Sequence, residues 1–327
     1  MKSKILILLG LCLSLTASSL YSQQNTHWIG DGSNTNWFDD NNWDNGSHPL
    51  SSDNVYIQNS EGPILTSWQL IESENSVYNS NSSFGISGGA VTFKRFELIN
   101  NSRGNFDGGF FYNHEYFNIT HGSSLFMAGN SFVFSKFIDM YGGGSILGVN
   151  DSTLEFYIAH SYSSTIHVAD DSYVSGYAWN VSGSNMSISS SRINLTDLAF
   201  IDSSYIQLYN HGIIHVETLD ASSNGTLYMD LTSFIEVDYQ MTLGGSLFID
   251  TYGMSFVEGD SFTLFEAGTI VGTFDDVYIS GTLAEGLSWN LDNLYINGSI
   301  SVIPEPSTYA LIFGSLALAL AVYRRRK

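Results

Sequence analysis

Cysteine, proline and positive charge are all scarce in this sequence of 327 residues, and each shortage excludes a class of protein or site. The single cysteine, Cys12, lies in an apolar run at residues 5–15 that follows two lysines and precedes small residues. This pattern predicts a secretory signal peptide over residues 1–22, cleaved near Ser19 or Ser22. The mature chain would then contain no cysteine. That excludes disulfides, a cysteine nucleophile and a thiolate metal site even in an oxidising compartment.

Positive charge is nearly absent between the two ends of the chain. Two of the 11 Lys and Arg lie in the predicted leader and four are the last four residues, which leaves five in residues 23–303. The same segment holds 31 of the 32 Asp and Glu, so its formal charge is −26. Nucleic-acid binding requires clustered cations, so we exclude nucleic acid as a partner. Anionic lipids and polyanionic sugars are disfavoured by long-range repulsion, whereas neutral glycans and divalent cations are acceptable.

Proline is limited to four residues, and helix signals are missing between residues 23 and 303. Short β-branched and aromatic runs alternate there with Gly, Asn, Asp and Ser, which is typical of strands and turns. A Ser-x-apolar element recurs at intervals of 21, 20 and 19, and then of 13 and 29. Its serines are Ser131, Ser152, Ser172, Ser191, Ser204 and Ser233. The near-constant period predicts an all-β fold, a single right-handed parallel β-helix, with the irregular intervals as loops or shifted turns. A sandwich of two sheets is the alternative.

Three tryptophans, Trp28, Trp37 and Trp43, fall in residues 23–60, a candidate N-terminal cap. Their W-x-G, W and N-W spacing resembles the opening of secreted autotransporter-like β-helix proteins. Two later segments are similar to the closing strands of such proteins: residues 259–265 and 286–298. A solenoid needs both ends covered, because an open strand edge invites aggregation. The tryptophans could instead form a platform on which sugar rings stack.

Few patterns in the sequence point to catalysis or metal binding. The Asx-rich stretch 39–46 departs from the EF-hand pattern, so we expect solvated turns there, with an irregular Ca²⁺ site as the alternative. If His211 and His215 share a strand, they lie about 13 Å apart, too far for one metal ion, whereas a loop could bring them closer. Acid doublets such as 170–171 and 275–276 would point to opposite faces of a strand, which makes them poor catalytic pairs. We therefore predict no catalytic residue, no metal site and no cofactor.

The last 24 residues carry the strongest functional signal. They consist of the motif Pro304, Glu305 and Pro306, an apolar run at 309–323, and the basic cluster Arg324, Arg325, Arg326 and Lys327. The prolines predict an extended, accessible motif without strand pairing. The apolar run predicts a minimal membrane-spanning helix with the cations on the cytoplasmic side. Together the three parts resemble the PEP-CTERM sorting signal of Gram-negative bacteria. That resemblance implies an exosortase-type sorting enzyme as partner, transient anchoring in the inner membrane, and export by bacteria that often secrete exopolysaccharide.

These observations predict a leader (1–22), a β-solenoid body (23–303) and a sorting tail (304–327) in an exported protein. We expect a non-enzymatic, structural or adhesive role in the cell envelope, on the outer surface or in the extracellular matrix, with exopolysaccharide as a candidate partner. A carbohydrate-active enzyme or a glycan-binding module on the same scaffold is the alternative.

Overall fold

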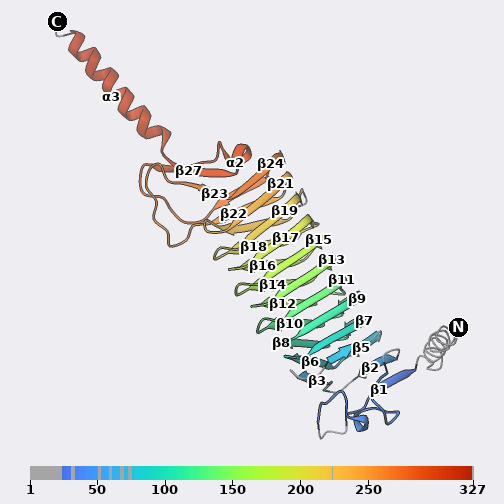
Figure 1. Cartoon of the computed structure of the whole chain (residues 1–327). Helices are drawn as coiled ribbons and strands as arrows, with labels where there is room; N and C mark the ends of the chain where they lie inside the picture. Colours follow the sequence, from blue (N-terminus) through green and yellow to red (C-terminus); the bar gives the residue numbers. More distant parts are fainter. Residues whose placement is uncertain are drawn as a thin grey trace, which may run out of the picture. The chain divides into compact units, whose positions relative to one another are not determined.

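The computed structural model describes residues 24–325, apart from 31–33, 51–52, 59–60, 67–69, 73–75 and 223. The predicted signal peptide, Arg326 and Lys327 lie outside the described residues. Contacts divide the chain into two units, Met1–Thr165 (unit 1) and Ile166–Lys327 (unit 2). Each unit is built from parallel strands stacked coil upon coil, so the predicted all-β parallel solenoid is confirmed (Figure 1).

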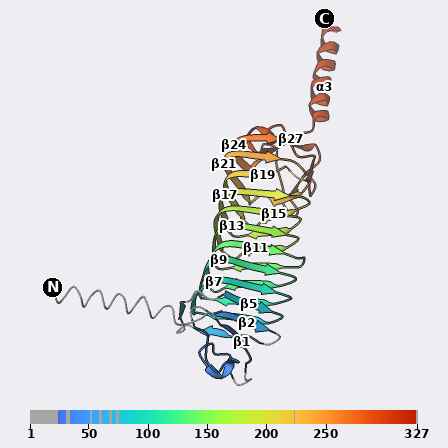
Figure 2. The same ribbon diagram turned by 90° about the vertical axis from the view of Figure 1, so that its right-hand side faces the viewer.

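Unit 1 contains parts of two parallel sheets, which we call sheet A and sheet B. Its sheet A has the order β1-β2-β5-β7-β9-β11-β13, with β4 beside β7, and its sheet B has the order β3-β6-β8-β10-β12. Figure 2 shows the sheet A strands following one another as rungs. The elements are β1 Asn25–Trp28, the 3-10 helix η1 Asp40–Asn42, β2 Asn54–Gln58, β3 Ile64–Thr66, β4 Leu70–Glu72, β5 Ser76–Ser80, β6 Ser83–Ser87, β7 Ala90–Ile99, β8 Arg103–Asp107, β9 Phe110–Thr120, β10 Ser124–Ala128, β11 Phe132–Tyr141, β12 Ile146–Asn150 and β13 Thr153–Tyr162.

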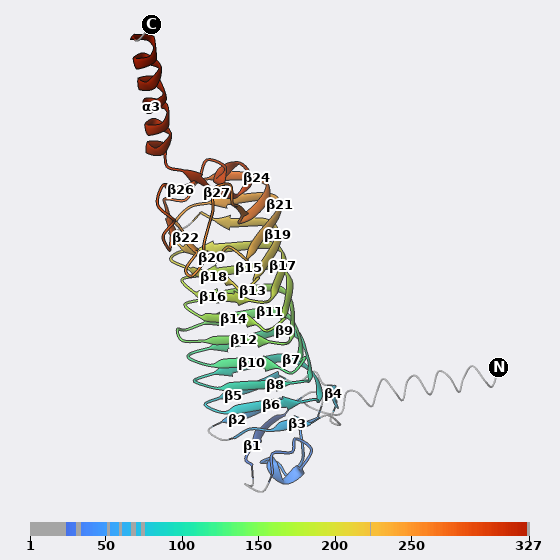
Figure 3. The ribbon, with the colours of Figure 1, turned by 90° about the vertical axis from the view of Figure 1, so that its left-hand side faces the viewer.

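Unit 2 repeats this arrangement and then departs from it. Its sheet A strands are ordered β15-β17-β19-β21-β24 and its sheet B strands β16-β18-β20-β22-β25, while β23-β27-β26 form a small antiparallel sheet (Figure 3). The elements are β14 Thr165–Ala169 at the unit boundary, β15 Tyr173–Ser182, β16 Asn185–Ser189, β17 Arg192–Ile201, β18 Tyr205–Tyr209, β19 Ile213–Ala221, β20 Thr226–Asp230, β21 Phe234–Leu243, β22 Ser246–Asp250, β23 Ser261–Thr263, β24 Phe265–Gly272, β25 Asp276–Ile279, β26 Leu287–Asn290, α2 Leu294–Asn297, β27 Ser299–Pro304 and α3 Pro306–Arg325.

Alternating burial explains why these sequences form coils. Along β11 every second side chain is buried, except that two consecutive residues, Lys136 and Phe137, are not buried where the register with β9 shifts. Each buried position lies on its equivalents in the neighbouring coils, as Val133 does between Phe111 and Leu154. Fully burying one aliphatic side chain stabilises the fold by about 1.5–3 kcal/mol. The stack of inward side chains is therefore the core.

All six serines of the Ser-x-apolar repeat are buried, each just before a strand. They belong to two ladders rather than one, where a ladder is the series of equivalent turn positions in successive coils, either before the strands of sheet A or before those of sheet B. Ser191 and Ser233 precede strands of sheet A, Gly212 stands at the equivalent turn between them, and Ser204 precedes β18 of sheet B. The prediction of loops or shifted turns at the intervals of 13 and 29 is therefore wrong. Sheet A keeps two steps of 21 residues there, and the odd intervals arise from counting across ladders.

Serine suits these turns because its short hydroxyl can bond to nearby backbone. Ser102, Ser131, Ser172 and Ser204 each donate from Oγ to the carbonyl three residues earlier, at 2.5–2.7 Å. The hydroxyls also join coils, since the Ser172 amide donates to Ser191 Oγ at 3.1 Å. Buried serine thus adds a hydrogen bond to turn carbonyls, three of which, those of Ile99, Ala128 and Ile201, also accept a backbone amide.

The three N-terminal tryptophans form a plug in unit 1. Trp28, Trp37 and Trp43 are only 4%, 1% and 1% exposed, and the Trp43 ring lies edge-on to the other two at centroid distances of 5.0 and 4.9 Å. The Trp43 indole N–H donates to the Trp37 carbonyl at 2.8 Å, and that of Trp28 to the Glu61 carbonyl at 2.9 Å. Covered rings and paired N–H groups favour the predicted cap over the sugar-stacking platform.

The segments predicted as closing strands do contain strands, in β23 and β26, which pair antiparallel with β27. Pro304 is the last residue of β27 and faces Leu287, and the Glu305 amide donates to the Gly286 carbonyl at 2.8 Å. The prediction that the prolines prevent strand pairing is therefore wrong at Pro304. There β27 pairs with β26 alone, since β23 pairs only with residues 299–301, and the next amide, that of Glu305, supplies the bond to the Gly286 carbonyl beside β26, so the missing N–H of Pro304 breaks no ladder bond. Pro306 begins α3, a position where its missing N–H costs little.

The tail helix α3 runs over 20 residues. Its described side chains, from residue 314 to 325, are all exposed, including Leu316, Leu318 and Leu320. In the part of the chain that is described, no helix is both long enough and apolar enough to cross a membrane. The membrane-spanning helix predicted from the apolar run is thus not confirmed.

Candidate functional site

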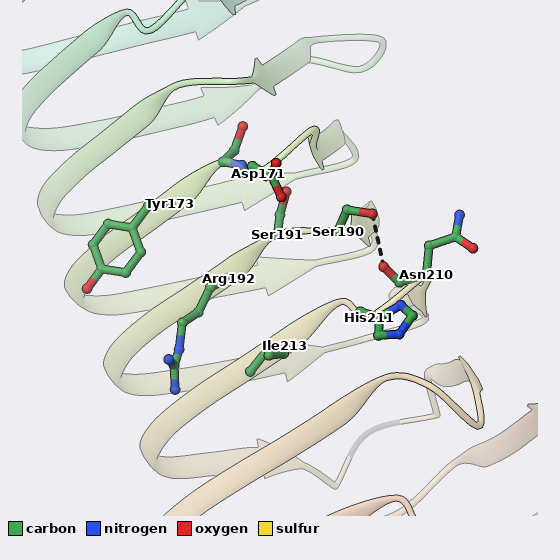
Figure 4. Close-up of a pocket in the computed structure, with 9 residues that line it drawn as sticks. Asp171, Tyr173, Ser190, Ser191, Arg192, Asn210, His211 and Ile213 are labelled. Atoms are coloured by element: carbon green, nitrogen blue, oxygen red, sulfur yellow. Dashed lines mark hydrogen bonds between the residues drawn. The ribbon is translucent and has the colours of Figure 1, made fainter.

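A hollow on the described surface of unit 2 lies where the turns before β15, β17 and β19 meet the outer face of sheet A (Figure 4). Its volume is about 510 Å³. Three successive coils supply three residues each, from the turn and the first strand position. The lining residues are Asp171, Ser172, Tyr173, Ser190, Ser191, Arg192, Asn210, His211 and Ile213.

The turn fixes one group of these side chains at one end of the hollow. Asp171 and His211 have positive φ values of 60° and 66°, the left-handed conformation that Asp, Asn and His adopt more readily than other non-glycine residues. Ser190 donates from Oγ to the Asn210 carbonyl at 3.0 Å. The hollow therefore has an acid and an imidazole at its turn end, held by backbone geometry.

The strand supplies the other group, which points away from the turn. In Figure 4, Tyr173 and Arg192 extend along the outer face while Asp171 and His211 stay at the turn. The Tyr173 hydroxyl accepts a hydrogen bond from Asn194 Nδ2 at 3.1 Å, and Arg192 Nη2 lies 3.9 Å from Glu236 Oε2. Acid, base and cation thus do not converge on one point, so this hollow lacks the geometry of a nucleophile beside its base.

A second hollow of about 290 Å³ lies further along the same strands, at their bends. It is lined by Ser175, Gly176, Asn194, Leu195, Thr196, His215, Glu217 and Asp238. Here polar groups do converge: His215 Nε2 lies 3.3 Å from Asp238 Oδ1, and Glu236 is the register partner of His215 on β21. Ligand atoms of His215, Glu236 and Asp238 all lie within 4.8 Å of one another.

This group was missed by the sequence reasoning, which weighed His215 only together with His211 and on the condition that the two share a strand. In the structure His211 lies in the turn and only His215 lies on β19, so the assumed 13 Å strand spacing does not apply. Glu236 and Asp238 sit 21 and 23 residues later, one coil away. A coil-by-coil alignment at 21 residues would have placed Glu236 beside His215.

The acid doublets also lie differently from the prediction. Asp170 and Asp171 both have positive φ and occupy the turn between β14 and β15, not a strand. Asp275 precedes β25, and its amide donates to the Gly245 carbonyl at 2.6 Å. Contrary to the prediction, Asp170 and Asp171 therefore do not point to opposite faces of a strand.

The Asx-rich stretch in unit 1 uses its carboxylates to hold its own backbone. Asp39 Oδ1 accepts from the Asn41 amide at 3.0 Å and Asp44 Oδ1 from the His27 amide at 2.9 Å. The His48 amide, followed by the His48 ring at 2.7 Å, lowers the pKa of the exposed Asp40 carboxyl. The Asp39 contact is that of an Asx turn, whereas Asp40 and Asp44 bond to residues further along the chain.

Comparison of the chain with protein-family models, with curated protein sequences and with solved structures finds no match in any of the three.

Proposed function

We propose that this chain is an exported, non-enzymatic protein of a Gram-negative bacterium, with a structural or adhesive role on the cell surface, in the envelope or in the extracellular matrix. Its body would be a right-handed β-solenoid, the sense that parallel crossovers nearly always take. Its tail would be handed to an exosortase-type enzyme after transient anchoring in the inner membrane. Exopolysaccharide is the candidate matrix partner.

The observation that carries this proposal is the exposure of α3. Leu316, Leu318 and Leu320 are 58%, 68% and 56% exposed, and Val322 and Tyr323 are also exposed. Contiguous apolar surface of this kind marks a site that another molecule or a membrane covers. The basic residues that follow suit an interface with anionic lipid headgroups, and they are separated from the acidic body by the length of the helix. A tail of this kind is suited to binding by a membrane or a sorting enzyme and does not stabilise the body.

The sorting step is tested in a Gram-negative host that encodes an exosortase. We expect the tail to be removed, so that the surface-exposed form has the mass of the chain without α3. The combined variant Pro304→Ala, Glu305→Ala, Pro306→Ala should keep the tail and accumulate in the inner-membrane fraction, as should the unaltered chain in an exosortase deletion strain. Intact-mass measurement and immunoblots of cell fractions report both outcomes. Identical mass and location in all three cases would refute the sorting role.

A carbohydrate-active enzyme or glycan-binding module is the second candidate, and the two hollows on the outer face of sheet A favour it. A glycan array and hydrolysis assays on residues 23–303 separate it from the structural role. Binding without cleavage would fit an adhesive module. Cleavage of any polysaccharide would overturn the non-enzymatic proposal.

A further inference from the structure

We propose that His215, Glu236 and Asp238 bind one divalent metal ion of the Zn²⁺ class on the outer face of sheet A in unit 2. A nitrogen of the imidazole and one oxygen from each carboxylate lie within 4.8 Å of one another. Among the described residues this is the one group of three potential metal ligands that meets in this way. The site goes beyond the structural or adhesive role and does not depend on it.

The fold brings the three side chains together through register and a bulge. His215 on β19 and Glu236 on β21 are direct partners in the parallel ladder. The next pairs, Val216 with Val237 and Thr218 with Gln240, enclose one residue on β19 but two on β21. This extra residue is a β-bulge, a feature that re-aims side chains and is common beside functional sites. It places Asp238 within 3.3 Å of His215, although the two are not register partners.

A glycine on the next strand makes room for the bulge. Gly268 on β24 is the single residue opposite Asp238 and Tyr239. A Cβ atom at Gly268 would lie 2.5 Å from the Asp238 carbonyl oxygen and 2.9 Å from that of Tyr239. The bulge backbone thus packs directly on Gly268, and this contact holds Asp238 in its position toward His215.

The local charge favours a cation at this place. Glu236 has Asp238 two residues away on its own strand and Glu266 as its register partner on β24. Like charges directly opposite each other destabilise a sheet. Arg192 is the cation that contacts Glu236, at 3.9 Å, and both side chains are nearly half exposed, so the pair contributes little. A divalent ion would neutralise the excess negative charge far more completely.

The donor set indicates the class of ion. One imidazole with two carboxylates suits Zn²⁺ and its neighbours, whereas Ca²⁺ prefers six or more oxygen ligands. Ligand atoms around tetrahedral Zn²⁺ lie about 3.4 Å apart, given bonds of about 2.1 Å. Partly exposed side chains can close from 4.8 Å to that separation by rotation about their own bonds. Three protein ligands leave a fourth position, which would face the hollow lined by His215, Glu217 and Asp238.

Unit 1 offers a matched control. His160 Nδ1 lies 2.9 Å from Asp139 Oδ1, so the same kind of imidazole–carboxylate pair exists there. That pair belongs to no group of three potential ligands among the described residues. His160→Ala therefore removes a comparable imidazole without touching the proposed site.

The experiment uses the full chain without a histidine tag, stripped with a chelator and titrated with ZnCl₂ by calorimetry. We expect one strong Zn²⁺ site per chain. His215→Ala should abolish it, and Glu236→Gln and Asp238→Asn should each weaken it by at least about ten-fold, the loss that even a change outside the first ligands causes. His160→Ala should bind as the unaltered chain does. Arg192→Gln should tighten binding, because it removes a competing cation.

Two further measurements keep the result interpretable. Circular dichroism of each metal-free variant should show the same spectrum as the unaltered chain. If His215→Ala fails to fold, the two isosteric variants Glu236→Gln and Asp238→Asn still test the site. Zn²⁺ should raise the melting temperature of the unaltered chain more than that of Glu236→Gln at the same Zn²⁺ concentration. Equal Zn²⁺ uptake by the unaltered chain, His215→Ala and the amide variants would overturn the proposal. So would a loss on His160→Ala as large as on His215→Ala, or binding of CaCl₂ in preference to ZnCl₂.

Discussion

The buried serine ladder can be tested at a position where each hydrogen bond is known. Ser131 is 1% exposed and donates from Oγ to the Ala128 carbonyl at 2.6 Å, while the Gly108 amide donates to Ser131 Oγ at 2.9 Å. Ser131→Ala removes both bonds. The Gly108 amide keeps a second acceptor in the Ala128 carbonyl at 3.1 Å, so it is not left unpaired. With about 1 kcal/mol for a net hydrogen bond, we expect a destabilisation of about 1–2 kcal/mol.

Ser233 provides the control, because it occupies the same turn of a later coil. It is also buried, but its Oγ has no hydrogen-bond partner among the described residues. Ser233→Ala should therefore be neutral or stabilise the fold by up to about 1 kcal/mol, since it removes a buried polar atom that lacks a partner. The two substitutions are chemically identical and differ only in the bonds that they delete.

The assay must resolve individual coils, because stacked repeats can open locally. Hydrogen exchange measured by mass spectrometry on peptides that cover each turn meets this need. Exchange around Ser131 should rise about 5- to 30-fold in Ser131→Ala, the factor that corresponds to 1–2 kcal/mol. Exchange around Ser233 should stay constant or fall in Ser233→Ala. Equal increases at both turns would refute the claim that these hydroxyl bonds hold the coils.

Two further substitutions test the tryptophan plug of unit 1 and the bulge of β21. Trp37→Ala should destabilise unit 1 by about 3–5 kcal/mol, because it leaves a cavity in the plug beside Trp43 and Phe84; an unchanged melting temperature would contradict the role of the plug. Gly268→Ala should lower the melting temperature by the equivalent of about 1–3 kcal/mol and weaken Zn²⁺ binding, because its Cβ would press on bulge backbone. Gly85→Ala should cost less, since its Cβ would meet the Ile64 side chain at 3.2 Å, and an equal cost would contradict the bulge argument.

The repeat shows which part of this fold can be predicted from sequence. Intervals near 20 between Ser131 and Ser191 predict coils correctly, because one coil must return to the same turn after a fixed length of chain. The second ladder was hidden, because Ser204 of sheet B resembles a member of the sheet A series. Gly212 broke the series although it fills the same turn as serine. A pattern defined by one residue type misses a position that requires only a small residue.

The candidate site could not be predicted from such a pattern, for a different reason. His215 and Glu236 become neighbours through the 21-residue coil, which the period could have predicted. Asp238 reaches them only because β21 contains an extra residue at its bend. Whether a bend holds one residue or two depends on packing against the strands on either side, here including Gly268. That information is not carried by the local sequence of β21.

The acidity of the chain has two different structural consequences in unit 2. In sheet B, Asp230 and Asp250 are direct register partners, yet both accept hydrogen bonds. The Asn210 amide donates to Asp230 at 2.8 Å, and bonds from Ser280 and then from Tyr228 lower the pKa of Asp250.

In sheet A, the equivalent like-charged pair of Glu236 and Glu266 has Arg192 as its contacting cation at 3.9 Å. When strands stack in register, equal charges at equivalent positions lie directly opposite each other. Each such carboxylate therefore needs a hydrogen-bond donor or a cation beside it. Asp230 and Asp250 find donors in the Asn210 amide and in the Tyr228 and Ser280 hydroxyls. Glu236 and Asp238, on the open face at the bend, instead contact a guanidinium and an imidazole, and it is there that His215, Glu236 and Asp238 form the proposed set of metal ligands. A cation at this point would therefore stabilise a stretch of sheet A where stacking in register brings the like charges of Glu236 and Glu266 together.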